Sequence, residues 1–436
     1  MSRSYTTITC HYKKLFCFCD LCQLPTVCRP SKMGRKYMIL FALVAMGLCV
    51  AADDEVFHYL GHEFDKTPLG DAIDKASIKM LTEAYQSSEE KNLIASPLGV
   101  FTLLSLYSAG APGPVSEEVV AALGASNYTE LFNSYSSLSA RFADMDASYL
   151  TLANKIYVSN KYTLAEEFEA TASRSFRSEV EAISFEDATA AAKTINHWAE
   201  AKTQGHIKNP MPEDAIDPTV VAALLNVIFF QGHWGVPFNA SETKEEDFRV
   251  SSDVTVKKPM MHLLSSLFYY ESKTLDAKLV ELPYKETGFR MVVVLPNAAD
   301  GLPELLKKVE QHGLLSDVFQ LEPAGVEIDV RMPKFDIESE LDLTTLLPKM
   351  GISKLFSDAA SGIVKGDSVV VSKAFHKAFA RIDEEGATAG AFTGFIAVPL
   401  SSNYKSPPPM PFHADHPFLF IIMYQDKTLF IGTYTH

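Results

Sequence analysis

Beyond Cys49 the chain contains no cysteine, because all six of its cysteines lie within the first 49 residues. Disulfides, cysteine nucleophiles and cysteine-ligated metals are therefore excluded from the main body. Positive charge is also scarce there: residues 53–436 contain 32 lysines and arginines against 53 aspartates and glutamates, and the whole chain has a formal charge of −15. Since such a surface repels a phosphate backbone, we do not expect nucleic acid as a partner.

Motifs of catalysis and of cofactor binding are missing as well. The body has no Gly-x-Ser-x-Gly elbow, no glycine-rich nucleotide loop and no His-Glu-x-x-His helix. His413 and His416 have a spacing compatible with metal ligands, but Asp415 and Pro417 favour a turn at this place. The sequence predicts a protein that is not an enzyme and that uses neither a metal nor another cofactor.

The amino-terminal residues have the pattern of a secretory signal. A basic start at residues 34–36 is followed by an apolar run, Met38 to Val50, and by the small pair Ala51-Ala52. The run is short for a bilayer span, which favours cleavage near Ala52 over the alternatives of an uncleaved anchor or a buried helix. We therefore expect residues 33–52 to be a signal peptide, and the mature protein to be secreted, extracellular and free of the membrane.

Residues 1–32 precede this signal, and either Met33 or Met38 would serve as the start of a secretory protein. The cysteines of this segment lack the paired Cys-x-x-Cys spacing or the following histidines of a zinc site. We interpret residues 1–32 as an upstream extension that does not reach the mature protein.

Residues 53–436 contain no internal repeat and no glycine- and serine-rich linker, which predicts one large domain. With 47% hydrophobic and 21% charged residues, the chain has the composition of a soluble globular protein. Ser96-Pro97 is typical of a helix start, and the apolar pattern that follows ends at Gly110. A second helix is expected around Leu81.

Strand patterns dominate the remainder of the body. Val326 to Met332 alternates apolar and polar residues, the run Val220 to Phe230 is almost wholly apolar, and Val369 to Asp383 places His376 on one face with small apolar residues. The carboxyl end, residues 417–431, is typical of a buried hairpin. Early helices followed by many long strands predict an α+β protein with large antiparallel or mixed sheets.

One segment of the body, residues 386–404, contains no charged residue. In an extended chain its alternate residues face opposite sides, and one side is small or apolar throughout: Ala387, Ala389, Ala391, Thr393, Phe395 and Ala397. The segment is therefore compatible with a central strand, although its glycines and alanines make it a poor strand in isolation. A flexible surface loop is the alternative.

Short motifs are spread from about residue 65 to His436: residues 92–97 (NLIASP), 203–207 (TQGHI), 226–234 (NVIFFQGHW), 259–261 (PMM), 333–335 (PKF), 372–378 (SKAFHKA), 384–386 (EEG) and 412–418 (FHADHPF). In sequence and in order they resemble the motifs of the serpins, a family of serine protease inhibitors. The resemblance implies the serpin fold, in which three β-sheets and eight or nine helices carry an exposed reactive loop, here about residues 386–410. It also implies suicide inhibition, in which a protease cuts the loop, forms an acyl-enzyme and is trapped when the loop inserts into the main sheet.

The resemblance further implies roles for individual residues. It places a loop hinge at Glu384, Glu385, Gly386, Ala387, Thr388, Ala389, Gly390 and Ala391, a polar network under the opening of the sheet at Ser96, Asn226 and His376, and a cluster at the top of the sheet at Trp234, Lys334 and Glu384. The chain departs from the family at Ala387, usually threonine or serine, at Gly99, usually serine, and at Phe392, which is bulky for the hinge. These departures favour the alternative of a non-inhibitory serpin acting as a carrier, storage protein or chaperone.

Counting along the family's loop, seventeen residues from Glu384 reach Leu400, which predicts a scissile bond between Leu400 and Ser401. Leucine suits the pocket of a chymotrypsin- or elastase-like protease. The stretch from Leu400 to Phe418 is longer than in many serpins, so the sequence is also compatible with cleavage after Tyr404 or Lys405. Cleavage after Lys405 would direct the protein to trypsin-like proteases.

The expected partner is a serine protease held as a covalent acyl complex, and the protein itself is expected to be a monomer. The region of residues 127–142 tends to be basic in heparin-responsive serpins. Here it contains a single basic residue, Arg141, so we do not expect heparin activation. Asn127 and Asn239 each begin an Asn-x-Ser/Thr sequon, which secretion exposes to glycosylation.

Overall fold

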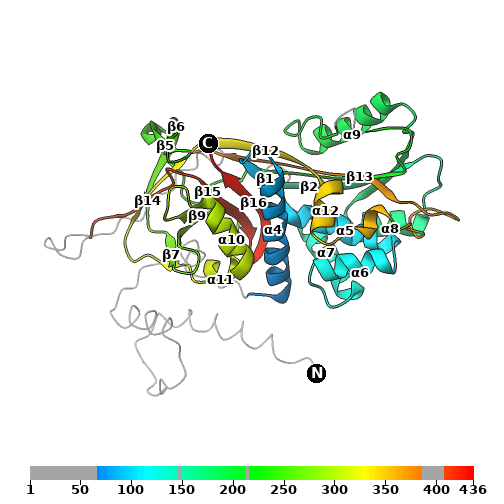
Figure 1. Ribbon diagram of the computed structural model, residues 1–436, viewed down its shortest axis with the longest axis horizontal. Coiled ribbons are helices and arrows are strands. Elements are labelled where there is room, and N and C mark those ends of the chain that lie inside the picture. Colours follow the sequence, from blue (N-terminus) through cyan, green and yellow to red (C-terminus); the bar gives the residue numbers. More distant parts are fainter. Residues whose placement is uncertain (1–65, 146–149, 212–215, 385–406) are drawn as a thin grey trace, which may run out of the picture. The chain divides into compact units, whose positions relative to one another are not determined.

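Three β-sheets and nine α-helices build the described part of the chain, residues 66–145, 150–211, 216–384 and 407–436 of a computed structural model (Figure 1). These residues belong to the unit Glu63–His436. The expected reactive loop lies outside the described residues except at its end, where Met410 already begins a strand. The predicted α+β architecture of three sheets is confirmed.

The helices begin with α4, whose start is fixed by its cap. Thr67 accepts a hydrogen bond from Gly70 N, and Pro68 occupies the first turn. The helix α5 has the bounds that its Ser96 cap and Gly110 predict, and it is buried on all sides. The helices are α4 (Pro68–Ser87), α5 (Pro97–Gly110), α6 (Pro114–Ala122), α7 (Tyr128–Ala143), α8 (Glu166–Phe176), α9 (Ala188–Lys202), α10 (Leu302–His312), α11 (Leu315–Val318) and α12 (Leu343–Lys349).

The largest sheet is wholly antiparallel and has the order β1-β16-β15-β9-β8-β7-β10. Its strands are β1 (Leu93–Ala95), β7 (Phe268–Ser272), β8 (Ala277–Pro283), β9 (Phe289–Pro296), β10 (Glu322–Pro323), β15 (Phe418–Tyr424) and β16 (Lys427–Tyr434). The predicted carboxyl-terminal hairpin is confirmed as β15 and β16, which turn at Gln425 with a φ of 56°.

A four-stranded sheet has the order β14-β11-β6-β5, and a five-stranded sheet has the order β12-β13-β4-β2-β3. The strands of the first are β5 (Lys244–Arg249), β6 (Thr255–Ser265), β11 (Ile328–Pro333) and β14 (Met410–His413). The strands of the second are β2 (Leu150–Ser159), β3 (Glu179–Ile183), β4 (Ala222–Phe230), β12 (Phe335–Asp342) and β13 (Val371–Ile382).

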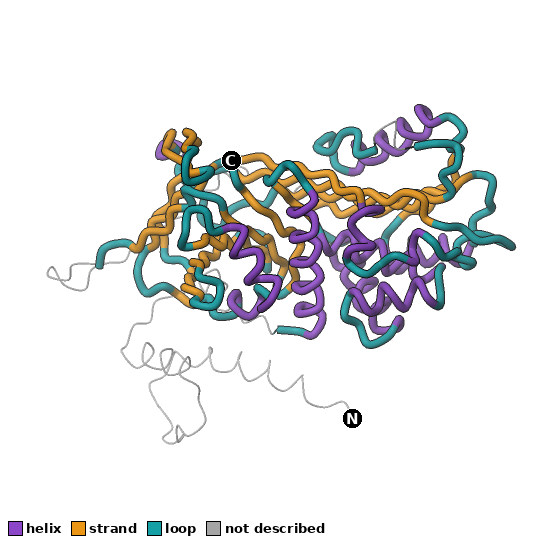
Figure 2. Tube along the Cα trace, in the orientation of Figure 1, coloured by secondary structure: helices purple, strands orange, loops and turns teal. Residues whose placement is uncertain are grey.

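The five-stranded sheet is covered on both faces. Helices α5 to α8 lie on one side of it, and α9 lies on the other (Figures 1 and 2). Leu224 and Ile228 of β4 belong to the main core with α5, whereas Leu225 and Phe229 belong to a second cluster with α9. This two-sided burial explains why β4 is almost wholly apolar in sequence.

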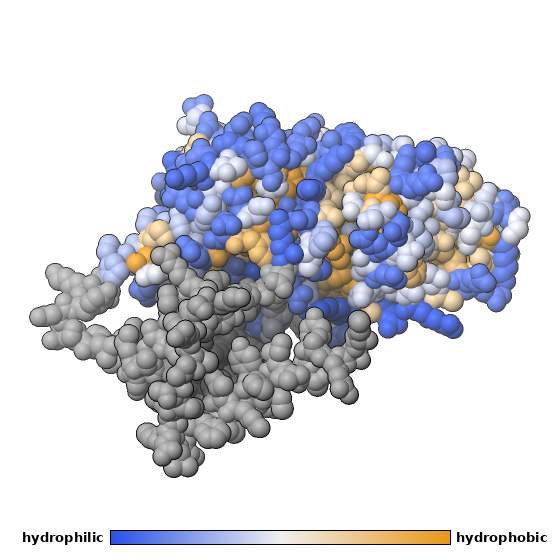
Figure 3. Space-filling view, turned by 90° about the horizontal axis from the view of Figure 1, so that it is seen from below, coloured by the Kyte–Doolittle hydropathy of each residue, from blue (hydrophilic) through white to orange (hydrophobic). Residues whose placement is uncertain are grey.

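The described part of the face shown in Figure 3 is mainly hydrophilic, and its apolar residues form smaller patches among polar ones. Among the described helices, we find none with the length and apolar character that crossing a bilayer requires.

Candidate functional site

The central feature of the five-stranded sheet is a joint between two parallel strands, β4 and β13. Their register places His376 opposite Asn226 and Ala380 opposite Phe230. β13 ends at Ile382, only two residues before the described chain stops at Glu384. The uncharged segment predicted from the sequence therefore follows this joint in the chain by only a few residues, and it lies outside the described residues.

Three polar residues lie together beneath the joint and are completely buried: Ser96, Asn226 and His376. The backbone N–H of Ser96 donates to Nε2 of His376 over 2.8 Å, and Nδ1 of the same ring lies 2.6 Å from Oδ1 of Asn226. Because Nε2 accepts, the ring proton sits on Nδ1 and is donated to the amide oxygen. Burial lowers the pKa of His376 to about 3, so the ring is neutral at physiological pH.

The network continues across the sheet to β2, because Nδ2 of Asn226 donates to Oδ1 of Asn154 over 2.7 Å. Gly99 leaves room for this amide. A Cβ at position 99 would lie 2.6 Å from Nδ2 and 2.7 Å from Oδ1 of Asn226, closer than real contacts allow. The glycine thus lets Asn226 fill the space that a serine would occupy, which gives this departure from the family a structural reason.

Glu384, the last described residue before position 385, belongs to a polar cluster, the proximal anchor, which consists of Trp234, Thr243, Lys334 and Glu384. Nζ of Lys334 lies 2.6 Å from Oε2 of Glu384, and the Thr243 hydroxyl donates to Oε1 over 2.8 Å. Burial would raise the pKa of Glu384, but the hydrogen bonds from Lys334 and Thr243 outweigh it and hold the pKa below its usual range.

The backbone around Glu384 is held as well. The indole N–H of Trp234 donates to the carbonyl oxygen of Asp383 over 2.7 Å. The backbone N–H of Phe238 donates to the carbonyl oxygen of Glu384 over 3.1 Å. The Trp234 ring is itself fixed by stacking on Tyr284, with centroids 4.5 Å apart. Three side chains, those of Lys334, Thr243 and Trp234, and the backbone amide of Phe238 thus hold Asp383 and Glu384.

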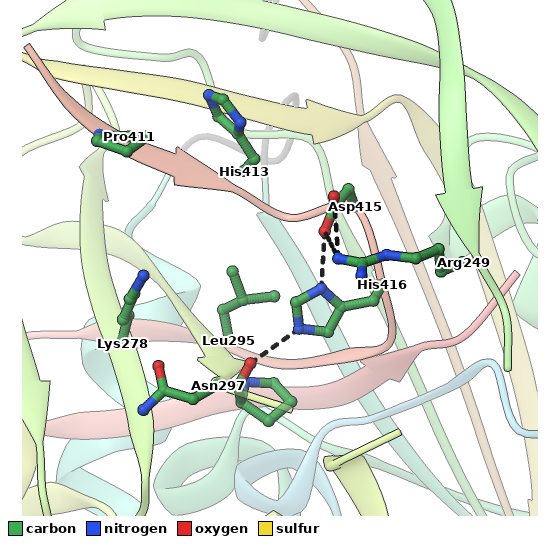
Figure 4. A pocket seen from close by; sticks show the side chains of 9 residues that line it. Arg249, Lys278, Leu295, Asn297, Pro411, His413, Asp415 and His416 are labelled. Atoms are coloured by element: carbon green, nitrogen blue, oxygen red, sulfur yellow. Dashed lines mark hydrogen bonds and ion pairs between the residues drawn. The ribbon is translucent and has the colours of Figure 1, made fainter. Parts of the chain in front are cut away.

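The distal end of the segment is held by strand pairing. β14 pairs in parallel with β11 from Met410 to His413, and Ala414 N donates to the carbonyl oxygen of Arg331. Beyond it, Arg249 binds both carboxylate oxygens of Asp415 (Figure 4).

His416 closes this corner, because its ring nitrogens lie 2.7 Å from Asp415 Oδ1 and 2.8 Å from the carbonyl oxygen of Pro296 (Figure 4). The ring therefore serves to fix the turn between β14 and β15. In the described residues, no group of three or more His, Asp or Glu side chains is arranged to hold a metal ion.

Several predicted site residues lie outside the described part of the chain. These are the hinge residues Glu385, Gly386, Ala387, Thr388, Ala389, Gly390 and Ala391, together with Leu400, Ser401, Tyr404 and Lys405. The two predicted sequons are described: Asn127 caps α7, and Asn239 precedes a short 3₁₀ helix, Ala240–Glu242.

Sequence reasoning did not identify Asn154, Thr243 or Arg249. A polar residue within an otherwise apolar strand pattern, as at Asn226, is a signal that applies equally to Asn154. Thr243 and Arg249 carry no such signal, because their contacts depend on pairing between segments more than 140 residues apart.

A family model described as Serpin (serine protease inhibitor) matches residues 71–436, so the chain belongs to the serpin family. Antichymotrypsin-2 of Bombyx mori is 34% identical over 83% of this chain and 96% of its own length, and antitrypsin of Bombyx mori is 33% identical over 83% and 92%. The crystal structure of Serpin48 of the insect Tenebrio molitor superposes with a TM-score of 0.74 at 32% identity, covering 86% of this chain and all of that one. Members of this family are mostly protease inhibitors rather than enzymes, and some do not inhibit.

Proposed function

We propose that the protein is a secreted, monomeric suicide-substrate inhibitor of a chymotrypsin- or elastase-like serine protease. The observation that carries the proposal is the parallel joint between β4 and β13, because the segment with one small-residue face follows β13 in the sequence. A chain that reverses after β13 runs antiparallel to β13 and, because the two strands are parallel, also antiparallel to β4. The joint therefore has the polarity to pair a new strand on both of its sides.

The chemical step uses the protease's own machinery. The serine oxygen of the protease bonds to the carbonyl carbon of Leu400, the peptide bond to Ser401 breaks, and the released amine of Ser401 takes the proton that the hydroxyl loses. The product is an ester between the protease and the new carboxyl end at Leu400. Insertion of the segment from Gly386 onward then moves the attached protease away before water hydrolyses the ester.

The faces of the joint support insertion of this particular segment. Beneath it lie Ala374, Ala378 and Ala380 of β13, all on the side of the main core. Ala387, Ala389 and Ala391 occupy the set of positions that would face the same side, where small side chains meet the least obstruction. Bulky Phe392 falls on the opposite set, toward the face that α9 covers.

The expected specificity comes from Leu400, whose side chain suits an apolar primary pocket. The names of the two silkworm relatives, antichymotrypsin and antitrypsin, support a protease of the chymotrypsin or trypsin type. Cleavage after Lys405 would favour the trypsin type, and cleavage after Tyr404 the chymotrypsin type.

A mixing experiment tests this function. Secreted protein is incubated with chymotrypsin, elastase and trypsin, separated by denaturing electrophoresis, and the released peptide is sequenced. The proposal predicts an SDS-resistant complex with chymotrypsin or elastase and a new terminus at Ser401. Complexes formed only through Lys405 would move the scissile bond, and simple cleavage without any complex would contradict inhibition.

A non-inhibitory role is the second candidate, and Ala387 and Phe392 in the hinge favour it. The glycine at position 99, where the family usually has serine, does not support a non-inhibitory role, because the Asn226 side chain occupies the space of the missing side chain. Secretion and processing are tested on the same material: the mature amino terminus is expected near Ala52 or Asp53, with no peptides from residues 1–32.

A further inference from the structure

A groove of about 550 Å³ lies among the end of α5, α6 and the start of α7. These three helices contact one another (Figure 1). Its volume is in the range of pockets that bind small organic molecules. The walls are mostly small or apolar, with Val120, Ala121 and the ring of Tyr128, and the polar side chains that line the groove include Ser116 and Glu117.

Asn127, the first residue of a sequon, also lines this groove. Its backbone is extended, with φ −164° and ψ 171°, and its Oδ1 caps α7 by accepting from Glu130 N over 3.0 Å. Glycosylation replaces one hydrogen on Nδ2 and leaves this oxygen free to accept. In the described residues, Nδ2 of Asn127 takes part in no hydrogen bond, so helix capping and sugar attachment are compatible.

The groove contains a polar group that lacks a protein partner. Ser116 is 6% exposed, and among the described residues its hydroxyl makes no hydrogen bond. A hydroxyl or acetamido group of a sugar would supply the partner, and the Glu117 carboxylate would accept from further sugar hydroxyls.

We propose that this groove binds the proximal N-acetylglucosamine residues of an N-linked glycan carried by Asn127. The apolar C–H face of the sugar packs against Tyr128 and Val120, while its polar edge meets Ser116 and Glu117. The attachment point at the rim supplies the first sugar at a high effective concentration, so weak contacts suffice. The proposal rests on the secretory route proposed above but not on protease inhibition.

The other sequon provides an internal comparison. Asn239 is exposed on a short 3₁₀ turn, where its Nδ2 already donates to Glu242 Oε1 over 3.0 Å and its Oδ1 accepts from Ser241. A glycan at Asn239 thus starts on an exposed turn, and we expect it to project into solvent.

The test is enzymatic release of the glycans from the full secreted chain. Peptide N-glycosidase F cuts at the Asn–sugar bond, and glycopeptide mass spectrometry follows each site in native and in denatured protein. We expect release from Asn127 to be slower in the native protein by about tenfold or more, since the enzyme must wait for the sugar to leave the groove. Asn239, where occupied, should show a much smaller difference.

Variants separate groove binding from general protection. Ala121→Trp fills the groove at an exposed helical position and should abolish the slow release at Asn127, whereas Ala190→Trp, at an exposed position of α9, should not. Ser116→Ala should accelerate release to an intermediate rate. The proposal would be overturned if Asn127 carries no glycan, if its glycan is released at equal rates from native and denatured protein, or if the slow release survives Ala121→Trp. Protease complex formation is assayed separately, because the proposal does not depend on it.

Discussion

The described residues that flank positions 385–406 on either side are held by different kinds of contact. At the proximal end, the proximal anchor holds Glu384 through side-chain hydrogen bonds from Lys334 and Thr243. At the distal end, β14 is a strand of the four-stranded sheet, with four consecutive residues paired to β11. Phe412 of β14 is 1% exposed, whereas the Lys334 side chain is 46% exposed.

This difference suggests how one cut can have a directed effect. If the chain is cut between the two ends, the distal piece remains paired to β11 through β14, whereas on the proximal side Asp383 and Glu384 are held by a few polar contacts. The residues that follow Glu384 in the sequence are also those whose alternate positions are small. The predictions below test this asymmetry, from the largest expected effect to the smallest.

Ala387→Arg should abolish inhibition and turn the protein into a substrate, because insertion would bury an unpaired charge. The native melting temperature should change little, because we expect the reactive loop to be exposed before cleavage, and exposed substitutions usually alter stability by no more than about 0.5 kcal/mol. Thr388→Arg, on the opposite set of alternate residues, is the matched control. Equal inhibition by Ala387→Arg and the unaltered protein would contradict the assignment of the two faces.

Phe412→Ala should lower the free energy of unfolding by about 3–5 kcal/mol, because it removes a fully buried aromatic ring from the distal strand. Chemical denaturation measures this loss, and Pro411→Ala, at an exposed position of the same strand, should change stability far less. A small loss of unfolding free energy with Phe412→Ala would contradict the conclusion that β14 is firmly packed.

Acid should weaken the joint through His376. The folded protein holds this ring neutral with a pKa of about 3, whereas the unfolded chain takes up a proton below about 6.5. The unfolded state then binds more protons, so stability falls as pH drops from about 6.5 toward 3, by up to about 1.4 kcal/mol per pH unit. Denaturation at pH 7.5 and 4.5 should therefore show a smaller acid loss in His376→Gln, and identical losses would refute this role.

Lys334→Met should have the smallest effect on the free energy of unfolding, a loss of about 1 kcal/mol or less. The lysine side chain is nearly half exposed, and Thr243 still binds Glu384. The lowered pKa of Glu384 stabilises the fold above its ordinary pKa, and this contribution is lost as pH falls through the lowered value. The variant should lose part of that acid dependence while Lys334→Arg keeps it. A loss as large as that of Phe412→Ala would remove the contrast between the two ends.

The sequence predicted local features better than contacts between distant segments. The bounds of α5 follow from a cap, a proline and a terminal glycine, which are all local signals. The shared face of His376 and the alanines of β13 follows from strand alternation. The bond from Asn226 to Asn154 depends on the register between β4 and β2, which no local pattern sets before the sheet assembles.

The central claim is that the joint between β4 and β13 accepts the segment that follows β13. The direct test is the melting temperature of protein nicked once between residues 398 and 405, compared with the intact protein by scanning calorimetry. Because the intact protein reaches the inserted state only after cleavage, the account predicts a markedly higher melting temperature after nicking, and no such rise in nicked Ala387→Arg. An unchanged melting temperature in the nicked, unaltered protein would contradict it.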